Sequence, residues 1–141
     1  MIMQDILQLK IEIQGMNTWR KIFIESDATF QDLHQFVQKI YGWENHHLHE
    51  FLVEDTVRIA STKTESTRDK IRGKFLHRDD REVFEEEQTL LSEFLNTKGD
   101  SLVYRYDFGD DWRYDIVLES IQDREYIEEY DEFPVKLEDN F

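Results

Sequence analysis

Residues 101–119 read SLVYRYDFGDDWRYDIVLE, two runs of alternating apolar and polar residues on either side of the tetrapeptide Phe-Gly-Asp-Asp. Alternation with a period of two is typical of strands that bury one face. We therefore predict a central β-hairpin, and we expect Gly109 to adopt a left-handed conformation because four residues must reverse the chain. The residues expected on the buried face of the second strand are Trp112, Tyr114, Ile116 and Leu118.

Two further pairs of strands are predicted on the N-terminal side of this hairpin. Residues 7–13 alternate with the same period, and residues 19–24 (WRKIFI) are aromatic and β-branched, with Gly15 turning the chain between them. Residues 47–53 (HLHEFLV) and 56–60 (TVRIA) form the second predicted pair. The short connections favour antiparallel pairing.

Two helices are predicted from apolar residues that recur every three or four positions. The first lies between Thr29, a suitable N-cap, and Gly42, a residue type that commonly ends helices. The second is a short amphipathic helix at residues 90–95, closed by residues 96–99. We expect the first helix to cover the hairpin, where the contacting side chains would be Phe36 or Ile40 and, opposite them, Trp112 and Tyr114.

Two segments are strongly charged. Residues 61–88 have little apolar periodicity and are predicted to form a charged loop, with a short helical piece around Glu82 to Phe84. Residues 120–141 form an acidic C-terminal segment that either adds an edge strand or stays loose. We expect the two segments to attract one another, because the loop contains seven basic residues: Lys63, Arg68, Lys70, Arg72, Lys74, Arg78 and Arg81.

These elements predict a single domain over residues 1–141, of class α+β. The expected architecture is a curved, mostly antiparallel (mixed) sheet of about six or seven strands packed by two helices. The 39% hydrophobic and 13% aromatic content is sufficient for one core. The sequence contains no cysteine, so disulfides and thiolate chemistry are excluded.

Composition also limits the partners. The formal net charge of -15 opposes contact with phosphate backbones, so nucleic acid is an unlikely partner. No apolar run is long enough to span a membrane, and the N-terminus resembles a strand rather than a signal peptide. We therefore expect a cytoplasmic protein without a membrane segment.

Four stretches resemble the plasmid pRiA ORF-three-like family in order and spacing: TWRKIFI (18–24), FQDLHQFVQKIYGW (30–43), HLHEF (47–51) and YRYDFGDDW (104–112). The resemblance covers about residues 7–119, and YDFGDDW is its most specific string. It implies a small α+β fold of unestablished function, in a family associated with mobile elements through members labelled as transposon resolvases. The residues of the resembling motifs that we expect to be structural are Trp19, Arg20, Trp43, Tyr106, Asp107, Gly109 and Trp112.

The chain departs from the family pattern in three places. Asn17 and Thr18 stand before Trp19 where members often have proline, and Arg113 and Tyr114 stand where members often have Glu-His. The cysteine- and proline-rich end of many members is also missing from this sequence. Because no Tyr-x-Arg-x-Ser segment supplies a serine nucleophile near the N-terminus, the resolvase label gains no support.

Two groups of side chains are candidate metal ligands. Asp107, Asp110 and Asp111 bring carboxylates to one hairpin tip, where hard cations could bind or where the carboxylates simply accept backbone N–H groups. His47 and His49 would share one face of a strand, next to His46 in the sequence. Zinc would need a third ligand there, from His34 or an aspartate, whereas packed or surface histidines need none.

The aromatic residues also have two interpretations. Trp19, Trp43 and Trp112 could line a ligand groove with Tyr104 and Tyr106, but aromatic residues on strand faces more often belong to the core. Separately, we expect Arg20 to pair with one of the hairpin aspartates, because a guanidinium group matches a carboxylate geometrically.

Three hypotheses for function remain. We favour a non-enzymatic binding or regulatory module that acts through protein contacts with an unknown partner. The first alternative is a metal-dependent hydrolase that uses the histidines and aspartates, and the second is an acidic decoy that mimics nucleic acid. The sequence contains no GxGxxG, GxSxG, HExxH or P-loop string, and we predict no cofactor and no catalytic residue.

Overall fold

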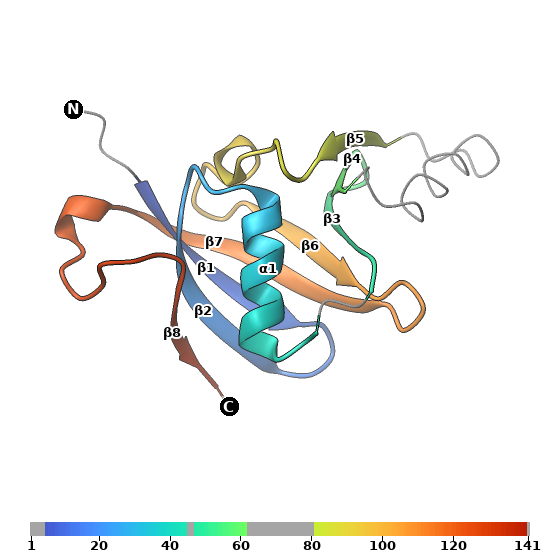
Figure 1. Ribbon diagram of the computed structural model, residues 1–141, viewed down its shortest axis with the longest axis horizontal. Helices are drawn as coiled ribbons and strands as arrows, with labels where there is room; N and C mark the ends of the chain where they lie inside the picture. Colours follow the sequence, from blue (N-terminus) through green and yellow to red (C-terminus); the bar gives the residue numbers. More distant parts are fainter. Residues whose placement is uncertain (1–4, 45–46, 62–80, 141) are drawn as a thin grey trace.

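A computed structural model describes residues 5–44, 47–61 and 81–140 (Figure 1). All described strands belong to one sheet of eight strands, in the order β5-β4-β3-β6-β7-β1-β2-β8. Neighbouring strands are antiparallel except for the parallel pair β4 and β5. The strands are β1 (Asp5–Ile13), β2 (Thr18–Glu25), β3 (His49–Val53), β4 (Val57–Ala60), β5 (Glu82–Glu85), β6 (Ser101–Tyr106), β7 (Trp112–Asp123) and β8 (Val135–Asp139).

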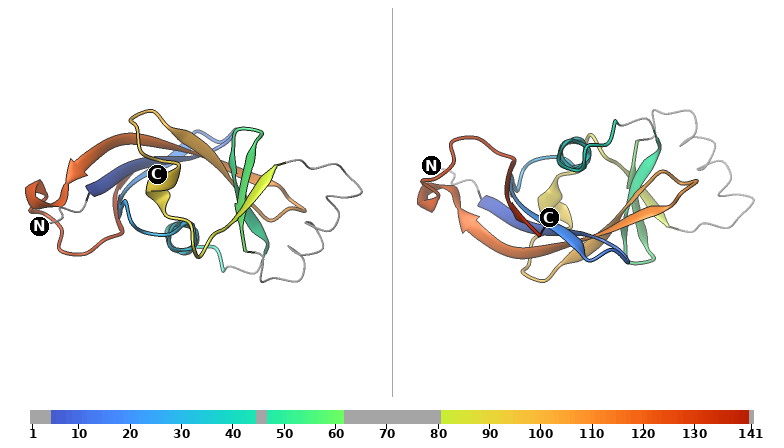
Figure 2. Two further views of the ribbon diagram at one scale, coloured as in Figure 1. Left: turned by 90° about the horizontal axis from the view of Figure 1, so that it is seen from above. Right: turned by 90° about the horizontal axis from the view of Figure 1, so that it is seen from below.

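The mixed sheet and the helix confirm an α+β architecture, but the described residues form eight strands rather than six or seven and one α-helix rather than two. That helix is α1 (Phe30–Tyr41), and the remaining helical pieces are the single 3₁₀ turns η1 (Leu91–Glu93) and η2 (Arg124–Tyr126). Figure 2 shows the sheet curving around α1. One face of the sheet is therefore covered by α1, and we call it the covered face.

The predicted central hairpin is confirmed as β6 and β7. β7 also pairs with β1 along its length, so the hairpin joins the two halves of the sheet. Tyr114, Ile116 and Leu118 are fully buried on the covered face, and Trp112 is partly buried against the same core. Phe36 and Ile40 of α1 pack on this core as well.

The ends of α1 follow the predicted capping chemistry. The Thr29 hydroxyl accepts a hydrogen bond from the Asp32 backbone N–H, and the Asp32 carboxylate accepts one from the Thr29 N–H. This reciprocal capping box satisfies donors that have no partner within the helix. At the other end Gly42 has φ 72°, the left-handed conformation that glycine adopts without a steric penalty.

The second predicted helix is wrong: residues 91–93 form only the 3₁₀ turn η1. The backbone after Leu95 explains the difference, because its N–H groups do not bond to carbonyls of a preceding helical turn. Asn96 N–H and Thr97 N–H instead donate to the Asp100 carboxylate at 3.1 Å and 2.9 Å. This side-chain cap ends the helical conformation after a single turn.

The helical piece predicted around Glu82 to Phe84 is also wrong, since these residues form β5 parallel to β4. A four-residue segment takes its structure from its neighbours more than from its own propensity. Of the seven basic residues in the predicted charged loop, only Arg81 lies within the described residues. The expected attraction between this loop and the acidic segment therefore stays a prediction.

The acidic C-terminal segment adds an edge strand, the first of its two predicted alternatives. β7 continues to Asp123, η2 follows, and β8 pairs antiparallel with β2 at the end of the sheet. Among the described residues, no helix combines the length and hydropathy that a membrane span requires.

Candidate functional site

The string YRYDFGDDW supplies side chains to both faces of the sheet. Tyr104 and Tyr106 of β6 are buried on the covered face, whereas Arg105 between them points to the opposite face. We call the opposite face the polar face. Because strand residues alternate, one short motif contributes both core aromatic residues and surface charge.

The turn between β6 and β7 is built by two aspartates. Asp107 has φ 59°, and its Oδ1 atom accepts hydrogen bonds from the backbone N–H groups of Gly109 at 3.1 Å and Asp110 at 3.4 Å. Asp111 has φ 56°. Gly109 is not among the residues with positive φ, so its predicted left-handed conformation is wrong. Asp tolerates this conformation because its short side chain bonds the local backbone.

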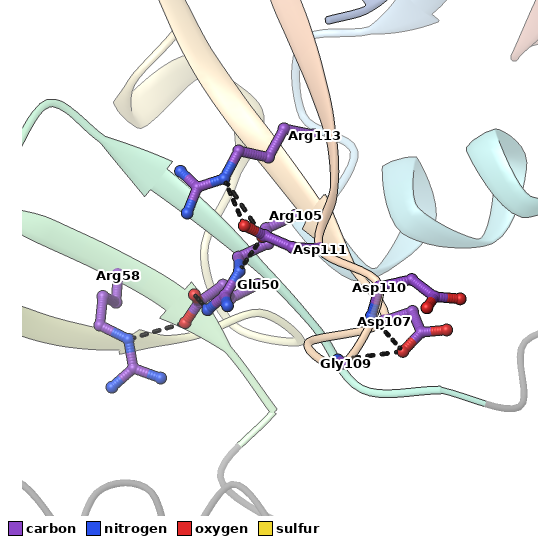
Figure 3. A network of polar contacts seen from close by, with 8 residues as sticks. All are labelled: Glu50, Arg58, Arg105, Asp107, Gly109, Asp110, Asp111 and Arg113. Carbon is purple, nitrogen blue, oxygen red and sulfur yellow. Dashed lines mark hydrogen bonds and ion pairs between the residues drawn. The ribbon is translucent and has the colours of Figure 1, made fainter.

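Asp111 connects two arginines on the polar face (Figure 3). Arg105 Nε donates to Asp111 Oδ1 at 2.5 Å, and Arg113 Nε donates to Oδ1 at 3.1 Å and to Oδ2 at 3.2 Å. The hydrogen bond from Arg105 lowers the pKa of the Asp111 carboxyl. The guanidinium of Arg105 also lies over the Phe108 ring, 4.6 Å from its centroid.

Glu50 of β3 extends this chain of charges toward β4. Its Oε2 atom accepts from Arg105 Nη1 at 3.1 Å, and its Oε1 atom accepts from Arg58 Nε at 2.8 Å. The side chains of Glu50 and Arg58 are each 1% exposed, whereas that of Arg105 is 20% exposed. The contacts form one charged network of five residues: Arg58, Glu50, Arg105, Asp111 and Arg113.

A pocket of about 590 Å³ lies beside the charged network. Arg105 and Arg113 line it together with Arg81, and the acidic lining includes Glu12, Glu50 and Asp115. Val103 and Val117 contribute apolar surface. The pocket therefore offers guanidinium groups, carboxylates and aliphatic side chains within one concavity.

Two of the candidate histidines meet on the covered face, where they are part of the packing. His34 of α1 and His49 of β3 stack with 3.4 Å between ring centroids and an interplanar angle of 5°. His34 Nδ1 lies 2.6 Å from the Tyr104 hydroxyl, which also accepts a hydrogen bond from Gln38 at 3.0 Å. Burial raises the pKa of Tyr104.

The His49 ring also approaches the buried carboxylate of Glu86, with Nε2 2.8 Å and 3.0 Å from its two oxygens. His47 lies elsewhere, with Nε2 3.7 Å from Asp107 Oδ2 and its ring against Tyr106. His46 lies outside the described residues. In residues 5–44, 47–61 and 81–140, no three His, Asp or Glu side chains are grouped to hold a metal ion.

The three tryptophans do not line a common groove. Trp43 packs against Tyr106 and Trp112, and its indole N–H donates to the Tyr114 hydroxyl at 2.6 Å. Trp19 lies instead near Lys10 and Lys21, whose Nζ atoms are 5.5 Å and 5.4 Å from its ring centroid.

Arg20 was predicted to pair with a hairpin aspartate, but it lies in a different environment. Its guanidinium lies over the Tyr41 ring, 4.0 Å from the centroid. In the antiparallel pairing of β2 with β8, Arg20 stands opposite Asp139. The arginines that bind the hairpin carboxylate of Asp111 come from β6 and β7. Arg20 therefore fastens the end of α1 to β2 rather than the first hairpin to the last.

The sequence comparisons identify the protein class. A family profile, that of the plasmid pRiA4b ORF-3-like proteins, matches residues 5–138, so the chain belongs to this family. This confirms the resemblance found from the four sequence stretches.

Two similar proteins are also of unestablished function. The chain is 29% identical over 117 residues to the uncharacterized protein y4hQ of Sinorhizobium fredii, a match that covers 82% of this chain and 54% of y4hQ. The crystal structure of MM3350 from Methanosarcina mazei Go1, a protein of unknown function, superposes with a TM-score of 0.75 at 27% identity. That match covers 98% of this chain and 71% of MM3350, and this chain spans about half the length of y4hQ.

Several residues of the site could not be identified from the sequence alone. Glu50, Arg58 and Glu86 are single charged residues within or beside strands, a pattern that usually indicates a solvated face. Arg105 had a usable signal, because its position between two tyrosines predicts that it points away from the core.

Proposed function

We propose that the protein is a non-enzymatic binding module that acts through protein contacts, and that the charged network is its contact surface. The observation that supports this most directly is the environment of Arg105. Its side chain is held by Asp111, Glu50 and the Phe108 ring, yet 20% of it remains exposed at the pocket. Such an arginine is oriented before a partner arrives.

Preorganisation matters because binding must offset the entropy lost when flexible side chains become fixed, about 0.5–1.5 kcal/mol for each. In the charged network folding already fixes the side chains, since the Glu50 carboxylate that holds Arg105 is itself buried against Arg58. Arginine is also enriched at protein interfaces and at their most energetic positions.

The pocket also suggests the character of the partner surface. Arg113 is 39% exposed and borders the pocket, while Glu12 and Asp115 line it with opposite charge. A partner that presents both signs of charge around a small apolar group would complement this lining. Mixed charge of this kind favours specificity over affinity.

No observation on the described residues favours either alternative function. The histidines proposed as ligands of a hydrolytic metal divide between a stacked pair and His47. The decoy hypothesis still rests on the net charge of -15 alone. The binding module is therefore the only function that we propose.

The test is site-specific photocrosslinking in living cells. A benzoylphenylalanine in place of Val103, which lines the pocket, should give a discrete protein adduct, and the same group in place of the exposed Met16 should not. Adding Arg113→Glu to the Val103 probe should remove the adduct, whereas Lys98→Glu, a charge reversal at an exposed position outside the pocket, should not.

The partner identified by mass spectrometry is then purified and its affinity measured by calorimetry. Arg113→Glu should weaken binding at least about tenfold, equivalent to about 1.4 kcal/mol. Adducts of equal yield from Val103 and Met16, or an affinity that Arg113→Glu leaves unchanged, would contradict the proposal.

A further inference from the structure

A second pocket of about 490 Å³ lies between α1 and the C-terminal segment. Its apolar lining consists of Ile24 at the end of β2, Ala28 and Phe36 on the α1 side, and Phe133 and Pro134 before β8. No residue of the charged network contributes to it. We call it the helix groove.

The walls of the helix groove are held in place by contacts outside it. Phe133 packs edge-on against Phe23 of β2, with 6.2 Å between ring centroids. The guanidinium of Arg124 lies 5.0 Å from the Phe133 ring centroid, and it donates to the Asp131 carbonyl at 3.2 Å. The groove is therefore formed before any ligand binds, which lowers the cost of binding.

The rim of the helix groove is acidic. Glu25, Asp27 and Asp32 line it against the single cation Lys39, so its lining carries three formal negative charges and one positive charge. Glu25 is partly compensated by Arg124 at 3.5 Å, and Asp32 caps α1 through the Thr29 N–H. Asp27 is exposed and stands in the turn between β2 and α1.

We propose that the helix groove binds a peptide segment of a partner protein in which a lysine or arginine is flanked by aliphatic residues. The apolar floor accommodates the aliphatic side chains, and the rim carboxylates attract the cation. The sign of the charge argues for this occupant, since an acidic segment would meet the rim carboxylates and a chain with a net charge of -15. The proposal does not depend on the function assigned to the charged network.

The probe for this proposal is the synthetic peptide acetyl-Leu-Arg-Leu-Arg-Leu-amide, added to the ¹⁵N-labelled chain of residues 1–141 and followed by NMR. Backbone signals of residues around Ile24, Asp27, Phe36 and Phe133 should shift in a saturable way. Two control peptides separate the contributions: replacing leucine by serine keeps the charge, and replacing arginine by glutamate keeps the apolar groups. Both controls should bind at least about tenfold more weakly.

Two charge reversals at exposed positions should change the affinity in opposite directions. Asp27→Lys should weaken binding of the leucine-arginine peptide about tenfold or more, and Lys39→Glu should strengthen it several-fold. Asp110→Lys, at an exposed position in the turn between β6 and β7 that does not line the helix groove, is the matched control and should change the affinity much less than Asp27→Lys. Thermal melts of each variant verify that the fold is retained.

Three results would overturn the proposal. The first is equal binding of the leucine-arginine and serine-arginine peptides, which would indicate simple attraction to an acidic protein. The second is a set of shifts confined to residues outside the helix groove. The third is an affinity that moves in the same direction for Asp27→Lys and Lys39→Glu.

Discussion

The two faces of the sheet differ in how they use aromatic and charged residues. On the covered face Tyr104, His34 of α1 and the partly buried His49 form a cluster, in which His34 Nδ1 bonds to the Tyr104 hydroxyl and the two imidazole rings stack. On the polar face Arg105 and Arg113 share the carboxylate of Asp111 at the edge of a pocket. The covered face thus supports the fold, while the polar face presents fixed charges to solvent.

This contrast explains the most specific string of the family without invoking catalysis. In YRYDFGDDW the tyrosines belong to the core, Asp107 and Asp111 shape the turn, and Arg105 belongs to the charged network. Of the three carboxylates that suggested a cation site, that of Asp107 accepts backbone N–H groups and that of Asp111 accepts two arginines. One motif therefore serves both faces of the sheet.

The largest loss of stability is expected from breaking the buried ion pair of the polar face, Glu50 with Arg58. Glu50→Gln removes the charge that faces the buried Arg58, and breaking a buried ion pair costs about 3–5 kcal/mol. The matched control is Asp115→Asn on the same face, which should cost less than about 1 kcal/mol because Asp115 bonds only to the exposed Gln14 among its described contacts. Urea unfolding measures both. Similar losses in the two variants would show that Arg58 does not rely on Glu50.

Neighbouring residues of β7 allow a direct comparison of the two faces. Ile116 is fully buried on the covered face, so Ile116→Ala should lower the free energy of unfolding by about 2–5 kcal/mol. Val117 lines the pocket on the polar face, and Val117→Ala should cost about 1 kcal/mol or less. Equal costs, measured by urea unfolding, would mean that the polar face is packed as tightly as the core.

The hydrogen bonds inside the covered cluster should have a measurable value. Tyr104→Phe removes the hydroxyl that approaches His34 and accepts from Gln38, at a cost of about 1–3 kcal/mol. Tyr106→Phe is the control, because the Tyr106 hydroxyl makes none of the hydrogen bonds seen in the described residues. A smaller loss for Tyr104→Phe than for Tyr106→Phe would refute a stabilising role of the cluster.

Alkaline pH should destabilise the covered face selectively. Burial raises the pKa of Tyr104, so folding favours its neutral form. This contribution is complete below the pKa of an unfolded tyrosine, about 10, and is lost as the pH rises above it. At pH 11 the loss from Tyr104 should be about 1.4 kcal/mol by urea unfolding. Burial also raises the pKa of Tyr114 and of Tyr41, so Tyr104→Phe should reduce the pH dependence between pH 9 and 11 without abolishing it. Tyr126→Phe, at an 81% exposed position, should leave the pH dependence unchanged.

The smallest effect concerns the hairpin turn. Asp107→Ala removes the acceptor of two backbone N–H groups at a position with φ 59°, and it should cost about 1 kcal/mol. Gly109→Ala should cost less than about 0.5 kcal/mol, because a Cβ there would meet only Asp107 Oδ1, at an ordinary 3.4 Å. A larger loss at Gly109 than at Asp107 would restore the original prediction for this turn.

The elements with a long local pattern were predicted well. β1, β2, β6, β7 and α1 each extend over enough alternating or helical positions to show which face is buried. The predicted pair of strands at 47–53 and 56–60 is also confirmed, as the shorter antiparallel strands β3 and β4. η1 was predicted as a longer helix because the Asp100 carboxylate, which accepts the N–H groups that follow it, has no clear signal in the sequence. β5 was mispredicted because it is short and takes its conformation from pairing with β4.

The candidate site was predictable only in part, for the same reason. The aspartates and histidines are conspicuous in the sequence, but their partners are not: Glu86 reaches His49, and Glu50 reaches Arg105, only through the pairing of strands. A positive φ was predicted for Gly109 because glycine is the usual residue for it. In this turn Asp107 and Asp111 adopt that conformation instead.

The place of β7 in the strand order has a consequence for how the chain folds during synthesis. The hairpin of β1 and β2 and the group of β3, β4 and β6 lie on opposite sides of β7 in the sheet. β1 pairs with β7 from Ile13↔Tyr114 to Asp5↔Asp123, residues that a ribosome makes far apart in time. Such non-local pairing slows folding and leaves strand edges exposed meanwhile. The two parts of the sheet can therefore join only after the ribosome has made β7, the strand that pairs with both.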